Sequence, residues 1–209
     1  MAASRSRAQG ASSSSSPCGY HVFLSFRGED TRKRFADYLY KALVNAGFRT
    51  FRDEDHAERG EPIGSELKKA IQRSRSSVIV FSKDYASSTW CLDELVMILN
   101  RRRISSHFVL PVFYDVDPTH VRKQTGSFAE AFDGYHKRIE EEKDEKKKKE
   151  WMKKVKEWTE ALQKVAELGG KVLINEADGV WEEKLFVSCH LRSLASVVDC
   201  GIKGIPSKY

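Results

Sequence analysis

Short apolar runs alternate with longer stretches at helical spacing, and this alternation is the feature that most constrains the fold. The apolar runs lie at residues 20–26, 48–51, 77–81 and 109–114, with a further candidate at 171–175. The third run contains Val-Ile-Val, which is typical of a strand buried on both faces. Strands that alternate with helices predict a parallel sheet with right-handed crossovers. We therefore expect an α/β fold: a flavodoxin-like, doubly wound, five-stranded parallel sheet of order 2-1-3-4-5, flanked by helices.

The stretches between these runs are predicted to be helices. Residues 31–46 carry an apolar stripe on one face, and Gly47 follows as the glycine that ends the helix. Further helices are expected at residues 88–101 and 150–168 and, in short form, through residues 67–71 and 128–132. Ser127 and Glu130 have the spacing of a capping box, which would start the last of these short helices.

Composition divides the 209 residues into one domain and two ends. Residues 1–17 are Ser-rich and lack the apolar core of a secretory signal, so we expect a disordered tail and leave a chloroplast address open. Residues 18–178 are expected to form one domain, and residues 179–209 a C-terminal extension of open structure. No apolar run approaches the roughly 18 residues that span a bilayer. We therefore expect no membrane span and a cytoplasmic location, with the nucleus as a second compartment.

The charge and cysteine patterns argue against several kinds of site. The net charge is +6, and much of the excess lies in residues 143–156, where the block Lys146–Lys149 is interleaved with acidic residues. Mixed charges of this kind indicate a solvated helix more often than a nucleic-acid surface, so nucleic acid is an unfavoured partner. The four cysteines form no C-x-x-C pair, and no Cys/His cluster has zinc spacing. We expect free thiols and no metal site.

The junction after the first apolar run has the features of a ligand-binding turn. Gly28 allows the backbone to approach a ribose or phosphate, Arg27 supplies a cation, and a helix N-terminus near Thr31 favours anions. In open α/β sheets, ligands bind at such junctions. An ion pair between Arg27 and Asp30 is the structural alternative. The candidate ligand-binding residues of this turn are Arg27, Gly28, Glu29, Asp30, Thr31 and Arg32.

Four motifs, in order along the chain, are similar to those of one known family. They are YHVFLSFRGEDTR at residues 20–32, FRDEDHAERG at 51–60, FSKDYASSTWCLDEL at 81–95 and LPVFYDVDP at 110–118. Together they resemble the plant-type Toll/interleukin-1 receptor (TIR) domain over about residues 18–178. The resemblance implies the flavodoxin-like fold that the alternation predicts independently.

The resemblance also implies a context. Plant relatives are immune proteins in which the TIR domain precedes a nucleotide-binding domain and leucine-rich repeats. This sequence contains neither a G-x-x-x-x-G-K-[ST] loop nor a leucine-rich repeat. We therefore expect a TIR-only or truncated relative of the plant disease-resistance receptors.

By resemblance, the chain cleaves the bond between nicotinamide and ribose in NAD+ or NADP+, with the dinucleotide as substrate and no permanently bound cofactor. The reaction passes through an oxocarbenium-like transition state, which a carboxylate stabilises. The resemblance assigns that carboxylate to Glu94, in the motif Trp90-Cys-Leu-Asp-Glu94. Taken without the resemblance, a glutamate on a helix is an ordinary solvated residue. Asp93 is expected to be a charge on the helix surface.

Further site residues follow from the same resemblance, each with a structural alternative. Trp90 offers a flat face for a nicotinamide or adenine ring, or packs in the core. Ser88 touches the ligand or caps its helix. In the family a mobile loop, here residues 54–63, completes the site next to a neighbouring protomer. Its carried-over positions are Arg59 and Gly60, although Glu58 stands where many relatives have an arginine.

The family self-associates through its first and last helices, often around a Ser-His pair, and through the 54–63 loop. Here the matching positions are Asp37 and Tyr38, which removes the small polar centre. We expect self-association and contacts with other TIR-domain proteins. Two alternatives stay open: a non-catalytic adaptor or decoy that binds receptor TIR domains, and nucleic-acid hydrolysis or nucleotide cyclisation at a basic surface.

Overall fold

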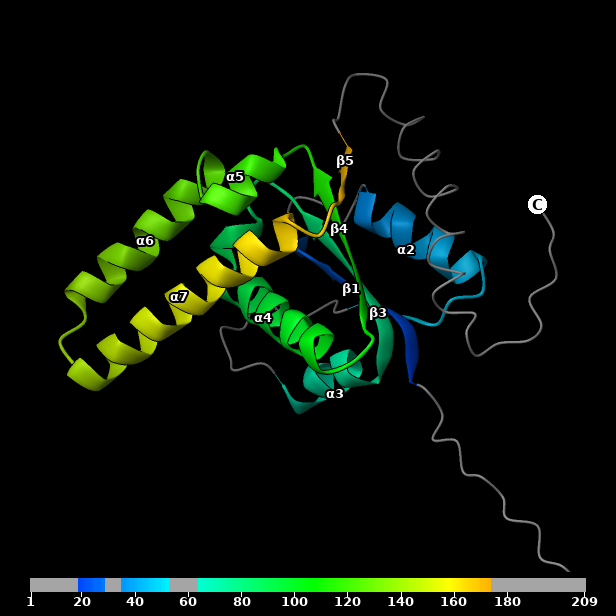
Figure 1. The fold of residues 1–209 in the computed structure, drawn as a ribbon, viewed down its shortest axis with the longest axis horizontal. Helices are drawn as coiled ribbons and strands as arrows, with labels where there is room; N and C mark the ends of the chain where they lie inside the picture. The colour runs from blue at the N-terminus through cyan, green and yellow to red at the C-terminus, as the bar shows by residue number, and fades with distance from the viewer. Residues whose placement is uncertain (1–18, 29–34, 53–63, 174–209) are drawn as a thin grey trace, which may run out of the picture.

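The strands form one parallel sheet in the predicted order. The computed structural model describes residues 19–28, 35–52 and 64–173 (Figure 1). The sheet has the order β2-β1-β3-β4-β5, and every neighbouring pair is parallel. This confirms the flavodoxin-like fold class. The strands are β1 Tyr20–Phe26, β2 Thr50–Arg52, β3 Ser74–Phe81, β4 Phe108–Tyr114 and β5 Lys171–Leu173.

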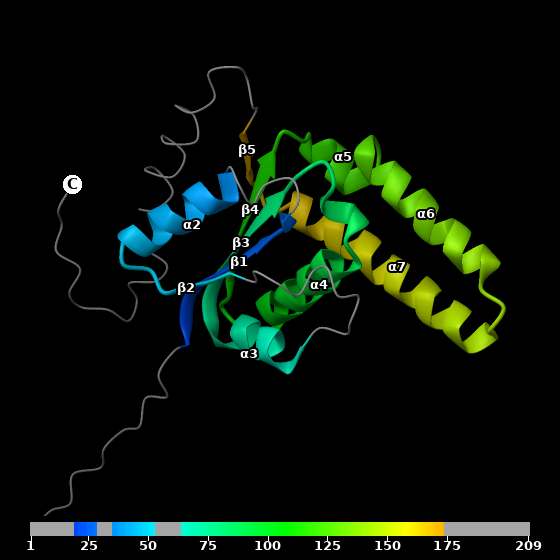
Figure 2. The same ribbon diagram turned by 180° about the vertical axis from the view of Figure 1, so that it is seen from behind.

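Helices cover both faces of the sheet, which is why its central strands are mostly apolar. On one face lies α2 (Phe35–Asn45), and on the other lie α3 (Ser65–Arg73) and α4 (Thr89–Ile104), as Figures 1 and 2 show. Two further helices, α6 (Ser127–Glu141) and α7 (Glu145–Ala166), run side by side on the α4 side. The core is therefore split into two apolar clusters, one on each face of the sheet.

Side chains of β1 alternate between these two clusters, and this alternation positions the site. Val22 and Leu24 pack with α2, whereas Phe23 packs with the helices of the other face. Because successive side chains of a strand point to opposite faces, Ser25 shares the face of Phe23. In the parallel register Ser25 lies opposite Ile79 of β3.

Gly47 ends α2 as the sequence predicts. Its φ angle is +85°, in the left-handed region that glycine adopts at no steric cost. The N–H of Gly47 donates to the carbonyl of Val44 at 2.9 Å, and that of Phe48 donates to the carbonyl of Leu43 at 3.0 Å. This pair of bonds is the Schellman motif, and it returns the chain toward β2.

Two sequence expectations about helices are wrong, and one helix was missed. Gly126, not Ser127, is the N-cap of α6, and no side chain caps it, so the expected capping box does not form. The helix is not short, since it continues to Glu141. A short helix, α5 (Pro118–Lys123), was not expected at all; Asp117 caps it and proline occupies its first turn.

The lysine block belongs to α7, which begins earlier than residue 150. The carboxylate of Asp144 accepts hydrogen bonds from the N–H groups of Lys146 at 2.8 Å and Lys147 at 3.2 Å, so it caps the helix. Lys146, Lys147 and Lys149 are exposed. This confirms the expected solvated helix of mixed charge.

Several boundaries lie outside the described ranges. The fifth strand is confirmed as Lys171–Leu173, and residues 174–175 of the expected run lie beyond it. The expected tail at 1–17 and extension at 179–209 lie outside the described residues and stay predictions. Among the helices of the described ranges, none combines the length and apolarity needed to cross a bilayer.

Candidate functional site

The predicted catalytic carboxylate, Glu94, is buried in the first part of α4. The Oγ atom of Ser88 accepts a hydrogen bond from the N–H of Cys91 at 3.3 Å, so Ser88 is the N-cap of this helix. Of the two roles open for Ser88, the structure therefore shows the cap. Glu94 lies one turn beyond Trp90, and its side chain is only 3% exposed. The alternative of an ordinary solvated glutamate is therefore excluded.

Both carboxylate oxygens of Glu94 accept hydrogen bonds. Oε2 accepts from the hydroxyl of Ser25 at 2.7 Å, and Oε1 accepts from the indole N–H of Trp90 at 2.9 Å. A buried carboxylate is costly unless such donors replace water. Ser25 comes from β1 and Trp90 from α4 itself, so Glu94 ties the helix to the sheet.

Tyr85 lies beside Ser25, the residue that donates to Glu94. Its hydroxyl donates to the carbonyl of Cys91 at 3.0 Å and lies 3.3 Å from the Oγ atom of Ser25. Burial raises the pKa of Tyr85 well above its ordinary value, so the phenol stays protonated. Tyr85 belongs to the short 3-10 helix η1 (Tyr85–Ser87), which connects β3 to α4.

Glu94 lies where the chain connections of the sheet diverge. The chain leaves β1 toward α2 on one face, and it leaves the neighbouring strand β3 toward α4 on the other (Figures 1 and 2). This arrangement is the topological switch point of a doubly wound sheet, next to which ligands bind. The bond between Ser25, near the end of β1, and Glu94 spans this point.

Arg27 holds the loop before α4. Its guanidinium donates to the carbonyl of Asp84 at 3.0 Å and to the hydroxyl of Ser87. This anchors the end of β1 to η1. The alternative, an ion pair between Arg27 and Asp30, stays a prediction because Asp30 lies outside the described ranges. The other predicted site residues outside these ranges are Glu29, Thr31, Arg32, Arg59 and Gly60. Gly28 is half-buried and ends the first described segment.

Of the two roles considered for Trp90, the structure shows the packing role. The side chain is 7% exposed and belongs to the core cluster on the helical face of the sheet. Its indole N–H nevertheless reaches the Glu94 carboxylate, because residues four apart on a helix are neighbours.

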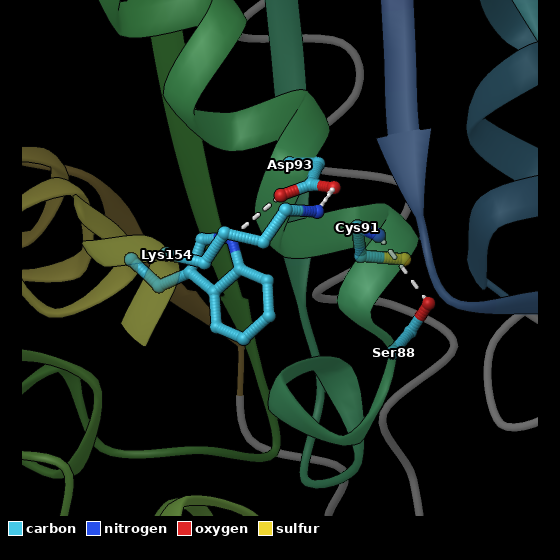
Figure 3. A network of polar contacts seen from close by, with 5 residues as sticks. Ser88, Cys91, Asp93 and Lys154 are labelled. Atoms are coloured by element: carbon cyan, nitrogen blue, oxygen red, sulfur yellow. Dashed lines mark hydrogen bonds and ion pairs between the residues drawn. The ribbon is translucent and has the colours of Figure 1, made fainter. Parts of the chain in front are cut away.

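The side chain of Asp93 points in a different direction from that of Glu94 and has different partners. Figure 3 shows Asp93 turned toward Lys154, whose Nζ atom donates to it at 2.9 Å. The indole N–H of Trp158 donates to the other carboxylate oxygen at 2.8 Å. Asp93 is therefore a half-buried link between α4 and α7, rather than the simple surface charge that was expected.

Asp37 also has partners within the domain. Its carboxylate pairs with Arg52 at 2.9 Å and with Lys41 at 2.7 Å. Hydrogen bonds from these two cations lower the pKa of Asp37. The guanidinium of Arg52 lies 4.3 Å from the centre of the Tyr40 ring. Asp37 thus joins α2 to the end of β2.

A hollow lies elsewhere on the domain, between the C-terminal ends of α4 and α7. It has a volume of about 790 Å³, and its lining includes Arg102, Arg103, Lys164 and Glu167. Glu94 does not line it. In the part of the chain that the structure describes, no three His, Cys, Asp or Glu side chains are placed to hold a metal ion.

Sequence reasoning missed Ser25 and Tyr85 as members of the site. The signal for Ser25 was present: a polar residue near the end of an apolar strand, on the face that the helix after β3 covers. Such a residue needs a buried partner. Tyr85 carries no comparable signal, since its hydroxyl partners are defined only by packing.

Comparison with known proteins gives a consistent result. The TIR domain family model matches residues 19–183. The chain is 51% identical over 179 residues to disease resistance protein RPV1 of Vitis rotundifolia. The matched region covers 83% of this chain and 12% of that protein. It is 53% identical over 154 residues to disease resistance protein RUN1 of the same species, over 72% of this chain and 11% of that protein. TMV resistance protein N of Nicotiana glutinosa is 47% identical over 159 residues, covering 76% and 13%.

These relatives are much longer proteins, and the chain spans between 11% and 13% of their length. Among solved structures, the TIR domains of the activated Roq1 resistosome, which directly recognises the pathogen effector XopQ, match with a TM-score of 0.71. The identity is 46%, over 83% of this chain and 98% of that one.

Proposed function

Because the chain belongs to the TIR domain family, we propose that it is an NAD(P)+ nucleosidase that produces nucleotide signals in plant innate immunity when it self-associates. The observation that carries this proposal is the buried Glu94 carboxylate, which accepts from Ser25 and Trp90 at the switch point of the sheet. The disease-resistance relatives support the immune role, and the assembled Roq1 TIR domains support the requirement for association.

In the proposed reaction, the bond between the ribose C1′ atom and the nicotinamide nitrogen breaks. Its electron pair stays on that nitrogen, so nicotinamide leaves as a neutral molecule and positive charge develops on the ribose ring. An ionised Glu94 stabilises this charge. Water then adds to C1′ and one proton is released, which gives ADP-ribose. Attack by a nucleophile within the same molecule instead of water gives a cyclic product.

The enclosure of Glu94 implies how substrate would reach it. The indole of Trp90 occupies Oε1, and Ser25 occupies Oε2 from the rigid sheet. A ribose hydroxyl is itself a hydrogen-bond donor, so it can replace the indole N–H on Oε1. One donor then exchanges for another, and the carboxylate is never left unpaired, which would cost about 1–3 kcal/mol or more.

The test is NAD+ consumption by the purified chain at low and high protein concentration. We expect the rate per molecule to rise with concentration. Glu94→Ala and the isosteric Glu94→Gln should each lose at least about a hundredfold in rate, the scale of removing one charge-stabilising group. Asp93→Asn is the matched control, because it changes the adjacent carboxylate, which faces α7. Folded Glu94→Gln protein that keeps the wild-type rate would refute the assignment.

A second function is supported by a specific observation. Glu94 is 3% exposed, so the described conformation presents little carboxylate to a substrate. This favours the alternative of a non-catalytic adaptor that binds receptor TIR domains. Under that alternative, the chain co-purifies with a receptor TIR domain equally well as wild type and as Glu94→Ala, and it consumes no NAD+ at any concentration.

A further inference from the structure

We propose that Ser25 is the positioning residue for Glu94, and that it acts with Tyr85 as a hydroxyl chain that holds the carboxyl group in place in either protonation state. This inference deepens the proposed NAD+ cleavage and rests on it for its catalytic meaning. It assigns separate roles to the two carboxylate oxygens. Oε2 stays with Ser25, and Oε1, which accepts from the Trp90 indole on the same helix, is the oxygen presented to the ribose.

Ser25 is better placed than Trp90 to fix the carboxylate. Trp90 lies on the same helix as Glu94, so it moves with the group that it contacts. Ser25 is 1% exposed and lies in β1, which pairs with β2 on one side and β3 on the other. A serine side chain has a single heavy-atom torsion, so the sheet sets the position of its hydroxyl. At 2.7 Å the bond has the length expected of a hydroxyl donating to a carboxylate.

The hydrogen bonds from Glu94 through Ser25 to Tyr85 explain why two hydroxyl groups are needed, because Glu94 can carry a proton or lack one. With Glu94 ionised, Ser25 donates to Oε2 and Tyr85 donates to the carbonyl of Cys91. With Glu94 protonated, its own proton can be donated to Ser25. The Ser25 hydroxyl then turns to donate to the Tyr85 oxygen 3.3 Å away, and Tyr85 keeps its bond to Cys91. Every proton has an acceptor in both states, as buried polar groups require.

This mechanism predicts opposite effects for the two hydroxyl groups. Ser25→Ala removes a donor to the ionised carboxylate, which disfavours the charged form. Tyr85→Phe removes the acceptor that Ser25 needs only when Glu94 is protonated, which disfavours the neutral form. The pH at which Glu94 is half protonated should therefore rise in Ser25→Ala and fall in Tyr85→Phe.

Two controls separate this role from general loss of a buried hydroxyl. Ser77→Ala removes a fully buried serine hydroxyl from β3, where Ser77 contacts the ring of His107. Tyr135→Phe removes a buried tyrosine hydroxyl that donates to the carbonyl of Ala86 at 2.8 Å. Neither hydroxyl contacts Glu94, so neither control should move its titration.

The experiment is a carbon-13 NMR titration of glutamate side-chain carboxyls in the full chain, with the Glu94 signal identified by its loss in Glu94→Gln. We expect the midpoint to rise by about one pH unit in Ser25→Ala, a tenfold change in proton affinity, and to fall in Tyr85→Phe. An unchanged midpoint in folded Ser25→Ala would overturn the proposal, as would shifts of the same sign in both variants.

Kinetics tests the catalytic meaning separately. For Ser25→Ala we expect kcat to fall by about a hundredfold, the scale of misplacing a reacting group by about 1 Å. KM should stay within about twofold, and the acid limb of the pH–rate profile should move to higher pH. A wild-type kcat and pH profile in Ser25→Ala would overturn the positioning role. Absence of NAD+ cleavage by wild type would instead refute the proposed function, whereas the titration would still decide whether Ser25 holds Glu94.

Discussion

Replacing Asp93 tests whether the carboxylate next to Glu94 has a structural role, as its contacts indicate. Asp93→Ala removes the acceptor of Trp158, whose side chain is 1% exposed, and leaves that indole N–H buried without a partner. An unsatisfied buried donor costs about 1–3 kcal/mol. The ion pair with Lys154 adds at most about 1 kcal/mol, because both of its side chains are partly solvated, at 49% and 28% exposed.

We therefore expect Asp93→Ala to lower the free energy of unfolding by about 1–4 kcal/mol. Asp93→Asn keeps an oxygen that can accept from Trp158 and loses only the ion pair, so it should cost less than about 1 kcal/mol. In melting temperature, a 2 kcal/mol loss corresponds to about 4–8 °C for a chain of this size.

The assay is urea unfolding of both variants, followed by far-ultraviolet circular dichroism so that no tryptophan signal is needed. A Trp158→Phe background completes a double-mutant cycle, since phenylalanine carries no donor to leave unpaired. In that background Asp93→Ala should cost at least about 1 kcal/mol less than in wild type. Equal costs in the two backgrounds, or equal stability of Asp93→Ala and Asp93→Asn, would refute the reasoning.

Two further predictions concern stability away from the site. Burial, followed by the nearby Arg101 guanidinium, lowers the pKa of His107 from 6.5 to about 4. As the pH falls, His107 therefore gains its proton at a higher pH in the unfolded chain than in the folded one. The stability that comes from keeping His107 neutral is full above pH 6.5 and is lost as the pH falls toward 4. Urea midpoints between pH 4 and 7 should fall more steeply with acid in wild type than in His107→Gln; parallel curves would contradict this. At Gly170, an added Cβ would lie 2.5 Å from both the Phe113 ring and the Pro111 carbonyl. Gly170→Ala should therefore cost about 1–3 kcal/mol, and a melting temperature equal to wild type would count against this close contact.

The fold was predictable because its signals are local. Short apolar runs marked each strand of the sheet, helical spacing marked the main helices, and glycine at position 47 marked the end of α2. The errors concerned helix boundaries, together with the short helix α5, which was missed. The backbone around Gly126 begins α6 without any side-chain cap, and the Asp144 carboxylate begins α7 before the periodic apolar stripe appears. Caps depend on one residue's conformation, which periodicity does not describe.

The candidate site was predictable only in part. Glu94 and Trp90 belong to one motif on one helix, and their spacing of four residues already places the indole next to the carboxylate. Asp93 is adjacent in sequence, yet its direction depends on where α7 packs, and it proved to be a link to that helix.

The sequence by itself determined the α/β fold class, the order of its strands and helices, and the motif that carries Glu94, because each of these is written in residues close together along the chain. Only the tertiary structure decided the partners. Ser25 and Glu94 are 69 residues apart, and Asp93 and Trp158 are 65 apart. A hydrogen bond between such residues requires both strand register and helix packing, since a donor displaced by about 1 Å no longer makes it. Those positions are set by the whole core at once, so no local pattern contains them.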